Sequence, residues 1–404
     1  MGSSMNSAVS GLRAHQLWLD VIGNNIANVN TPGFKDGRVT FTDILSQTLA
    51  GPTAPSATLG GTDPKQVGLG VRPGAITNLF TQGGVLSTGK PTDVAIQGDG
   101  FFILSDGTAS VYTRAGAFEV DAGGTLVDPT TGYRVQGNAG NIVISPTTTS
   151  APMPTSTAIF SGNLDTTVAA GSTYTSTLTI NDSLGGTHNL TLTFTKTANP
   201  GEFTYATTES DAAMSIAAGG AGTVQFSGAG AITAGGAGAI TLDFSNGASN
   251  GQAITLDYGS ASNTTPVTGF ASPSTLALGS QNGYAAGTLQ NFSIGTDGTI
   301  NGTFSNGRVQ SLGTIRLATF NNPAGLEKVG NNLFRESTNS GVANVGSPAT
   351  GGRGSLTPGA LEGSNVDLAE EFTRLILAQR GFQANARVIT TSDEVLQEAV
   401  NLKR

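Results

Sequence analysis

The chain opens with an apolar repeat in MNSAVSGLRAHQLWLDVIGNNIANV, residues 5–29. The large apolar residues of this repeat are Met5, Leu12, Leu19 and Ile26 at every seventh position, and Ile22 in a companion register. A seven-residue apolar repeat is typical of a helix that packs along another helix. Pro32 and Gly33 follow the repeat and favour the end of a helix. We therefore predict an N-terminal helix with an apolar seam.

The far end of the chain carries the same kind of repeat. Its members are Leu368, Leu375, Phe382, Ile389 and Leu396, with Phe372 in a companion register. Ser364 precedes Asp367 by three residues, a variant of the capping box that predicts a helix start here. Matching repeats at both ends predict that the termini pair as an α-helical coiled coil, in a subunit built to assemble.

The residues between these helices favour β structure. Gly accounts for 58 of 404 residues and only 11% of residues are charged, while short apolar runs alternate with Ser, Thr, Asn and Gly. This mixture is typical of short strands joined by tight turns. We expect hairpin turns at Gly98-Asp99-Gly100 and at Asp106-Gly107. Residues 34–73 lack periodicity and predict an extended connector, with a short helix around 41–45.

One segment of the interior repeats itself. Residues 218–222 return at 234–238, and residues 239–244 return at 253–258 with a similar sequence. Spacings this short favour consecutive hairpins over a solenoid. Low-complexity drift in a surface domain is an equally good explanation of the pattern.

Composition excludes several classes of function. The formal charge of −8 argues against nucleic-acid binding, and the absence of any apolar run of 18 residues argues against membrane insertion. There is no cysteine and no cleavable signal peptide is visible, and the two histidines, His15 and His188, have no ligand or nucleophile spacing. We expect no catalytic residue, metal site or cofactor, and therefore no enzyme.

Five stretches carry a resemblance to a known family. They are 23–28 running on to 31–35 (GNNIAN and TPGFK), 94–102 (VAIQGDGFF), 112–118 (YTRAGAF), 361–368 (LEGSNVDL) and 379–387 (QRGFQANAR). Together they resemble the bacterial flagellar rod and hook axial proteins, over about 1–145 and 285–404. The residues that carry the family motif are Asn24, Asn25, Asn28, Pro32, Gly33, Phe34, Gly98, Gly100, Phe101, Ser364 and Asn365.

The resemblance implies a mixed, multidomain fold with two mainly antiparallel β domains, the outer one β-barrel-like. The expected domains are a helical coiled coil (1–30 with 364–404), an extended connector (31–71 with 354–363), a discontinuous β domain (72–145 with 285–353) and an inserted outer β domain (146–284). The insert favours the layout of the family's hook members over its shorter rod members.

The function implied by the resemblance is structural. Such a subunit is expected to polymerise with itself into a curved hollow tube that transmits motor torque as a universal joint, outside the cell, after type III export without a cleavable signal. The implied partners are further copies of the chain, the hook cap, the distal rod, the hook-filament junction proteins and the export apparatus. The alternatives are a distal rod protein of the same family and, outside it, a secreted β-rich adhesin.

Overall fold

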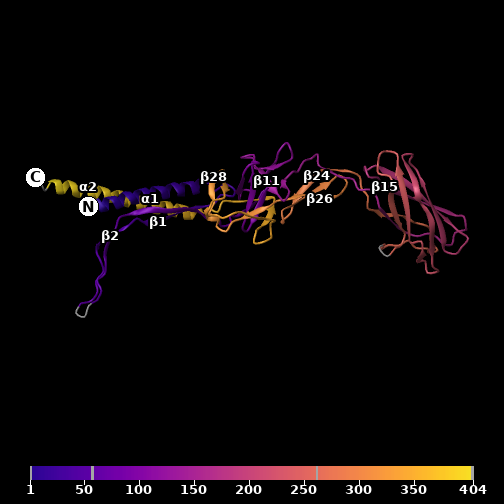
Figure 1. Cartoon of the computed structure of the whole chain (residues 1–404), viewed down its shortest axis with the longest axis horizontal. Helices are drawn as coiled ribbons and strands as arrows, with labels where there is room; N and C mark the ends of the chain where they lie inside the picture. The colour runs from indigo at the N-terminus through magenta and orange to yellow at the C-terminus, as the bar shows by residue number, and fades with distance from the viewer. Residues whose placement is uncertain (1, 56–58, 261–262, 402–404) are drawn as a thin grey trace. The chain divides into compact units, whose positions relative to one another are not determined.

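The computed structural model describes residues 2–55, 59–260 and 263–401, and the chain divides into two compact units (Figure 1). Unit 1 contains Met1–Ser145, Phe292–Asn301 and Ser311–Arg404, and unit 2 contains Pro146–Asn291 and Gly302–Gln310. Both α-helices belong to unit 1. The described residues thus form two terminal helices and many antiparallel strands, which confirms the mixed fold class.

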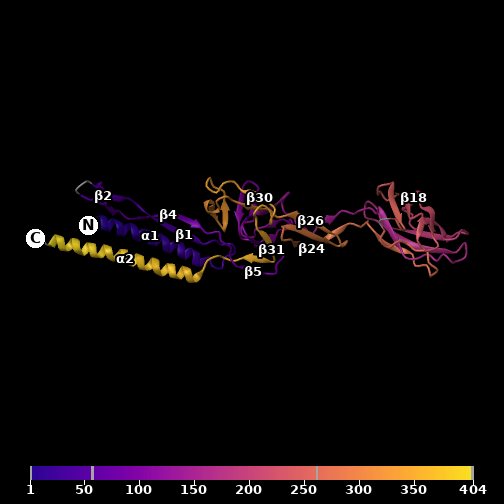
Figure 2. The same cartoon turned by 90° about the horizontal axis from the view of Figure 1, so that it is seen from below.

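The helices α1 (Gly2–Ala27) and α2 (Leu368–Asn401) lie side by side and antiparallel, with both chain ends at the same end of the pair (Figure 2). Three neighbouring pairs fix their register: Gly11 with Asn385, His15 with Gly381, and Asn25 with Glu371. The prediction that the two ends of the chain come together as helices is confirmed. In this register the last turns of α2 extend beyond the start of α1.

The N-terminus of α2 is capped by Asp367. Its Oδ1 accepts hydrogen bonds from the backbone N–H of Ala369 at 2.8 Å and of Glu370 at 3.2 Å, which is the usual N-cap arrangement. The prediction that Ser364 starts the helix is wrong. The Ser364 hydroxyl accepts the N–H of Val366 at 3.3 Å, before the helix, because the aspartate carboxylate directly precedes the first turn and takes its free N–H groups.

The end of α1 is set by the residues that follow it. Thr31 donates its N–H to Asn28 O at 3.1 Å, so the backbone turns, and Pro32 has no N–H with which to continue a helix. Gly33 has a φ of 70°, and a Cβ there would lie 2.5 Å from the backbone nitrogen of Ala115. Both the backbone conformation and this close approach therefore require glycine.

The connector after α1 forms two antiparallel strand pairs, one nested within the other along the chain. Strand β1 (Gly37–Asp43) pairs with β4 (Val71–Asn78), and β2 (Ser46–Ala50) pairs with β3 (Lys65–Gly68), in both cases antiparallel. The predicted short helix around 41–45 is wrong. The alternation of Val39 and Phe41 with Thr40 and Thr42 suits a strand, and pairing with β4 satisfies its backbone.

The β structure of unit 1 centres on a ten-stranded sheet. Its path is β28 (Glu327–Gly330), β29 (Leu333–Arg335), β8 (Ser110–Thr113), β7 (Phe101–Ser105), β11 (Arg134–Gly137), β10 (Leu126–Val127) and β9 (Glu119–Val120), with β12 (Gly140–Asn141), β27 (Leu317–Thr319) and β30 (Asn344–Gly346) attached. A short 3-10 turn, η1, spans Pro323–Gly325. One core beneath the sheet contains Phe101, Phe320 and Phe334, whose rings meet edge to face.

The C-terminal residues of the connector return to two early strands. β5 (Val85–Ser87) pairs with β32 (Ala360–Glu362), and β6 (Val94–Gln97) pairs with β31 (Ser355–Pro358). The predicted hairpin at Gly98-Asp99-Gly100 is therefore wrong, because β6 pairs with β31 and β7 pairs with β8. The hairpin predicted at Asp106-Gly107 is confirmed, since it joins β7 to β8.

Unit 2 contains two five-stranded sheets that share one core. One sheet has the order β18 (Met214–Gly219), β21 (Ala237–Phe244), β22 (Gln252–Asp257), β14 (Thr157–Ser161) and β23 (Ala277–Gln281); the other has β15 (Thr173–Asn181), β16 (Thr187–Lys196), β17 (Glu202–Glu209), β19 (Ala221–Phe226) and β20 (Ile232–Ala234). Side chains from both sheets, such as Phe194 and Leu242, pack in that core. The described strands form two open sheets and no closed barrel, which corrects the expected barrel-like shape to a sandwich.

Two smaller features complete the strand pattern. The repeated segments at 239–244 and 253–258 belong to β21 and β22, which are consecutive and antiparallel, so the hairpin interpretation is confirmed. A four-stranded sheet has the order β13 (Thr149–Ser150), β24 (Gly287–Ile294), β25 (Thr299–Phe304) and β26 (Val309–Thr314).

Candidate assembly surface and motif junction

Small residues form the contact between α1 and α2. A Cβ on Gly11 would lie 2.8 Å from Asn385 Nδ2, and a Cβ on Gly381 would lie 2.5 Å from the His15 ring. Ala8, Ala14 and Ala378 are buried in the same region, and Ile22 is the one large apolar residue of α1 that is fully buried. The two helices therefore approach closely along glycine and alanine rather than along a seam of leucines.

This arrangement decides where the predicted interface residues lie. Ile22 is buried, and the partly buried ones are Leu12, Leu19, Ile26, Leu375 and Ile389. Five others are exposed in the single chain: Met5 (36%), Leu368 (40%), Phe372 (52%), Phe382 (37%) and Leu396 (38%). Further large apolar side chains on α2 are exposed as well, namely Ile376, Leu377, Val388, Val395 and Val400. The heptad count includes Val400, which is four heptads after Phe372, and it misses the other four, because they lie outside its two registers.

An aromatic group lies between α1 and strand β1. The rings of His15, Trp18 and Phe41 have centroids 5.8 to 6.3 Å apart. Burial lowers the pKa of His15, which favours the neutral imidazole in this apolar setting. His15 is therefore a packing residue between α1 and β1.

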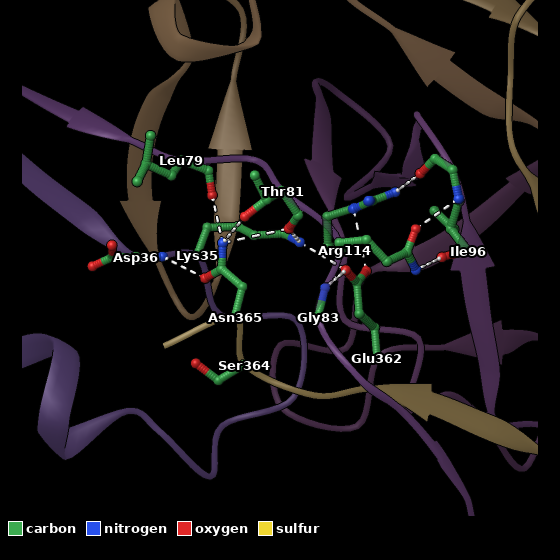
Figure 3. Close-up of polar contacts among 12 residues, drawn as sticks. Lys35, Asp36, Leu79, Thr81, Gly83, Ile96, Arg114, Glu362, Ser364 and Asn365 are labelled. Atoms are coloured by element: carbon green, nitrogen blue, oxygen red, sulfur yellow. Dashed lines mark hydrogen bonds and ion pairs between the residues drawn. The ribbon is translucent and has the colours of Figure 1, made fainter. Parts of the chain in front are cut away.

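A buried ionic group joins three distant parts of unit 1. Lys35 Nζ lies 2.7 Å from Glu362 Oε1, and Arg114 Nε lies 3.2 Å from Glu362 Oε2 (Figure 3). The Lys35 and Glu362 side chains are fully buried, and burial lowers the pKa of Lys35. Arg114 also donates through Nη1 to Gly98 O and Gly100 O, both at 2.8 Å. One carboxylate therefore connects the N-terminal motif, the middle motif and strand β32.

Asn365 extends this group toward the helices. Its Oδ1 accepts the backbone N–H of Asp36 at 2.8 Å, and its Nδ2 donates to Leu79 O and Thr81 Oγ1, both at 2.8 Å (Figure 3). Lys35 Nζ donates to Thr81 O at 2.7 Å. We call the group formed by Lys35, Arg114, Glu362 and Asn365 the motif junction.

A second polar cluster joins α1, the connector and α2. Asn25 Nδ2 donates to Asp36 Oδ1, to Gly37 O at 2.9 Å and to Glu371 Oε2 at 3.1 Å. Arg374 Nη1 lies 2.6 Å from Glu371 Oε1 and 3.5 Å from Asp36 Oδ2. Burial and the nearby Glu371 carboxylate raise the pKa of Asp36. This cluster fixes the angle at which the connector leaves the helix pair.

The structure brings most of the family-motif residues together around these two clusters. Gly33 donates its N–H to Glu362 O at 2.8 Å, and Asn332 Nδ2 donates to Pro32 O at 3.2 Å. Asn24, Asn28, Pro32 and Phe34 line a cleft of about 470 Å³. Phe101 is buried in the core of the β domain, and Ser364 lies in the turn before α2.

Sequence analysis missed the charged members of these clusters. Lys35, Arg114 and Glu362 stand inside the quoted motifs, but no role was predicted for them. The available signal was their charge, because charged residues make up only 11% of the chain and these three fall inside the quoted motif segments.

Among the described residues, no group of three His, Asp or Glu side chains is placed to hold a metal ion. None of the described helices combines the length and the apolar character needed to cross a membrane. The features that stand out are an exposed apolar helix surface and a buried junction that supports it.

Four family models match the chain. Their descriptions are "Flagella basal body rod protein" over residues 5–35, "Flagellar hook protein FlgE/F/G D1 domain" over 95–156, "Flagellar basal body protein FlaE D2 domain" over 144–284, and "Flagellar basal body rod FlgEFG protein C-terminal" over 357–402. The matches follow the chain in order and include both helices and the segment of the insert.

Similar proteins span the whole chain. The flagellar hook protein FlgE of Treponema pallidum is 40% identical and that of Borreliella burgdorferi 38% identical, with 100% of both chains covered in each case. The flagellar basal-body rod protein FlgG of Bacillus subtilis is 35% identical, covering 99% of both chains. Among solved structures, the Helicobacter pylori flagellar hook protein FlgE2 has a TM-score of 0.49 and 16% identity, covering 69% of this chain and 100% of that one.

Proposed function

This chain belongs to the family of flagellar hook and basal-body rod proteins, and from that membership we propose that it is a structural subunit of the bacterial flagellar hook. The observation that carries the proposal is the full-length similarity to two proteins named flagellar hook protein, at 40% and 38% identity. The match of 144–284 to a D2 domain supports it, because that segment corresponds to the insert that favours the hook layout.

We propose that copies of the chain polymerise through the helix pair. Large apolar side chains on α2, such as Phe372 at 52% exposure and Leu377 at 58%, gain stability when other copies cover them. The predicted interface residues that remain exposed in one copy belong to this surface. Packing between copies is where coiled-coil contacts, with large apolar side chains at heptad positions, are expected to form.

The domain layout follows from this role. The helices (1–30 with 364–404) form an inner tube, the connector (31–71 with 354–363) leads outward, and two β domains (72–145 with 285–353, and 146–284) form the outer shells. For their length, the β domains place fewer large apolar side chains on their surfaces than the helices do, which supports weak contacts that can be remade as the tube bends. A firm inner bundle with such outer shells transmits torque and permits curvature.

The surroundings of the chain follow from family membership too. We propose that the subunit lies in the extracellular hook, between distal rod and hook-filament junction proteins, and assembles under a hook cap. Export in an unfolded state through the flagellar type III apparatus agrees with the absence of cysteine from the sequence.

Electron microscopy of the purified chain, polymerised in solution, tests the proposal. We expect curved hollow tubes of uniform diameter. A solution that holds only monomers or closed small oligomers, at concentrations where related hook proteins assemble, would contradict it.

A rod subunit is the second candidate. The 35% identity to the Bacillus subtilis rod protein FlgG over 99% of both chains favours it. A rod subunit is expected to give straight, stiff tubes, so the curvature of the polymer separates the two candidates.

A further inference from the structure

The side of α2 that faces away from α1 carries four charged side chains without partners among the described residues. They are Arg380, Arg387, Glu394 and Glu398, and all four are exposed. None of the four side chains takes part in an ion pair or hydrogen bond with a described residue, whereas the side chain of Arg374, at the base of the same helix, pairs with three carboxylates. With 3.6 residues per turn, the spacing 380-387-394-398 keeps the four on one side of the helix, opposite Ala378 and Gly381. We call them the charge stripe.

The two signs are segregated along the stripe. Both arginines come first and both glutamates follow, with their centres separated by about 19 Å at a rise of 1.5 Å per residue. Helical neighbours that can form ion pairs are three or four residues apart, so Arg387 and Glu394 cannot pair within one helix. Glu394 and Glu398 are themselves four residues apart and repel each other. A single copy therefore leaves two separated charges of opposite sign, which a partner with the same pattern would neutralise.

We propose that a second copy of this chain, parallel to the first and displaced by about 19 Å along the helix axis, places its Arg380 and Arg387 beside Glu394 and Glu398 of the first copy. The inference rests on the proposed function, because it names the register between neighbouring subunits of the polymer. Without displacement, parallel copies would set arginine against arginine and glutamate against glutamate, which disfavours that register.

Charge reversal tests the inference. We expect Arg380→Glu/Arg387→Glu and Glu394→Arg/Glu398→Arg to raise the concentration needed for polymerisation by at least about tenfold each. An equimolar mixture of the two variants should polymerise nearly as well as the wild type, because each supplies the charge that the other lacks. Arg134→Glu/Arg308→Glu, two exposed arginines on the β units, is the matched control and should assemble normally. Normal assembly of either stripe variant, or a mixture that fails, would overturn the inference.

Cross-linking tests the direction of the neighbour. The chain has no cysteine, so Ala384→Cys/Gln397→Cys introduces the only thiols, on opposite flanks of α2 and 13 residues apart. A parallel neighbour at the proposed displacement joins them into a ladder of covalent multimers on oxidation. An antiparallel neighbour, which would also pair the four charges, gives covalent dimers and no ladder; dimers alone, or no cross-link in assembled tubes, would overturn the inference.

The wild-type chain separates this inference from the function on which it rests. If wild-type tubes form and the stripe variants assemble equally well, the register is wrong and the proposed function stands. If the wild type forms no polymer at all, both fail.

Discussion

Glu362 is the residue on which the motif junction depends. Its carboxylate lies against Lys35 and Arg114 and accepts the N–H of Gly83 at 3.0 Å, and its side chain is fully buried. Removing one member of a buried ion pair leaves the other charge without a partner and costs about 3–5 kcal/mol. We predict a loss of this size in the free energy of unfolding of Glu362→Gln, measured by chemical denaturation of the full chain.

Glu119 provides the matched control for this variant. It pairs with Lys90 at 2.7 Å, but both side chains are about half exposed, at 54% and 47%. Exposed pairs contribute at most about 1 kcal/mol, so Glu119→Gln should leave stability almost unchanged. Equal effects of the two substitutions would show that the junction does not support the fold.

His188 in unit 2 predicts a dependence of stability on pH. Its Nδ1 lies 2.6 Å from Asp211 Oδ2 and its Nε2 lies 3.1 Å from Asp182 Oδ2, so both contacts are hydrogen bonds only when the ring is protonated. Burial lowers the pKa of His188, but the hydrogen bonds to Asp182 and Asp211 outweigh burial and raise the pKa above its ordinary value of 6.5. The stabilisation is therefore fully present below pH 6.5 and is lost as the pH rises through the raised pKa.

Hydrogen exchange measures this loss. We expect the amide protection of β16 to fall as the pH rises above 6.5, after correction for the intrinsic exchange rate, because the neutral ring loses one of its two hydrogen bonds. In His188→Gln, which cannot titrate, the corrected protection should not vary across this range. A variant with the wild-type pH dependence would assign the effect to another group.

At the scale of elements, the helix pair buries few large apolar side chains within one copy. α1 buries one large apolar side chain fully, Ile22, and among the residues of α2 whose burial is described, Ala378 is the buried apolar one. Burying a large side chain contributes about 1.5–3 kcal/mol, while ordering each residue costs about 1–2 kcal/mol of backbone entropy. We predict that amides of both helices exchange rapidly in dilute monomer and slowly in the polymer. Strong protection of the helices in the monomer, comparable to that of β16, would contradict this.

Phe382 tests whether the exposed helix surface drives assembly. A charge at this position cannot be buried between copies without a large desolvation cost, so Phe382→Asp should abolish polymerisation. The β domains should keep their unfolding transition, because Phe382 lies outside their cores. The control is Phe270→Asp, at an aromatic residue of unit 2 that is 52% exposed. Polymerisation of Phe382→Asp at the wild-type concentration would show that this surface does not carry the contact.

The sequence predicted the elements whose signal is local. The repeats predicted both helices, and Asp106-Gly107 predicted its hairpin, since apolar period and turn chemistry act over a few residues. The pairing of β6 with β31 could not be predicted, because the two strands are far apart in the chain and Gly98-Asp99-Gly100 imitates a hairpin turn. The glycine contact between the helices was missed for a related reason. A search for repeats of large apolar residues detects leucine, but it does not detect Gly11 or Gly381.

At the scale of the whole molecule, two distant ends support one surface. Glu362 and Asn365 come from the C-terminal part of the chain and contact Lys35 and Asp36 of the N-terminal part. Helix α1 precedes Lys35 and Asp36 in the chain, and α2 follows Glu362 and Asn365. These contacts therefore hold the end of α1 near the start of α2. The motif residues and the exposed apolar residues consequently have separate roles. The motif residues hold the helix pair in position, and the exposed apolar residues are free to contact other copies.

The insert can be removed at a point that the structure defines. Met153 and Tyr284 exchange two backbone hydrogen bonds of 2.9 and 3.0 Å, so the chain enters and leaves the sandwich at adjacent positions. We predict that replacing 154–283 with a short Gly-Ser linker leaves the helix pair and the motif junction intact, because their residues lie outside the deleted segment. Tubes should still form, but with altered curvature or bending stiffness, measured from electron micrographs. A linker variant whose tubes match the wild type in both properties would show that the insert does not set the shape of the polymer, and a variant that forms no tubes would place an essential contact in the insert.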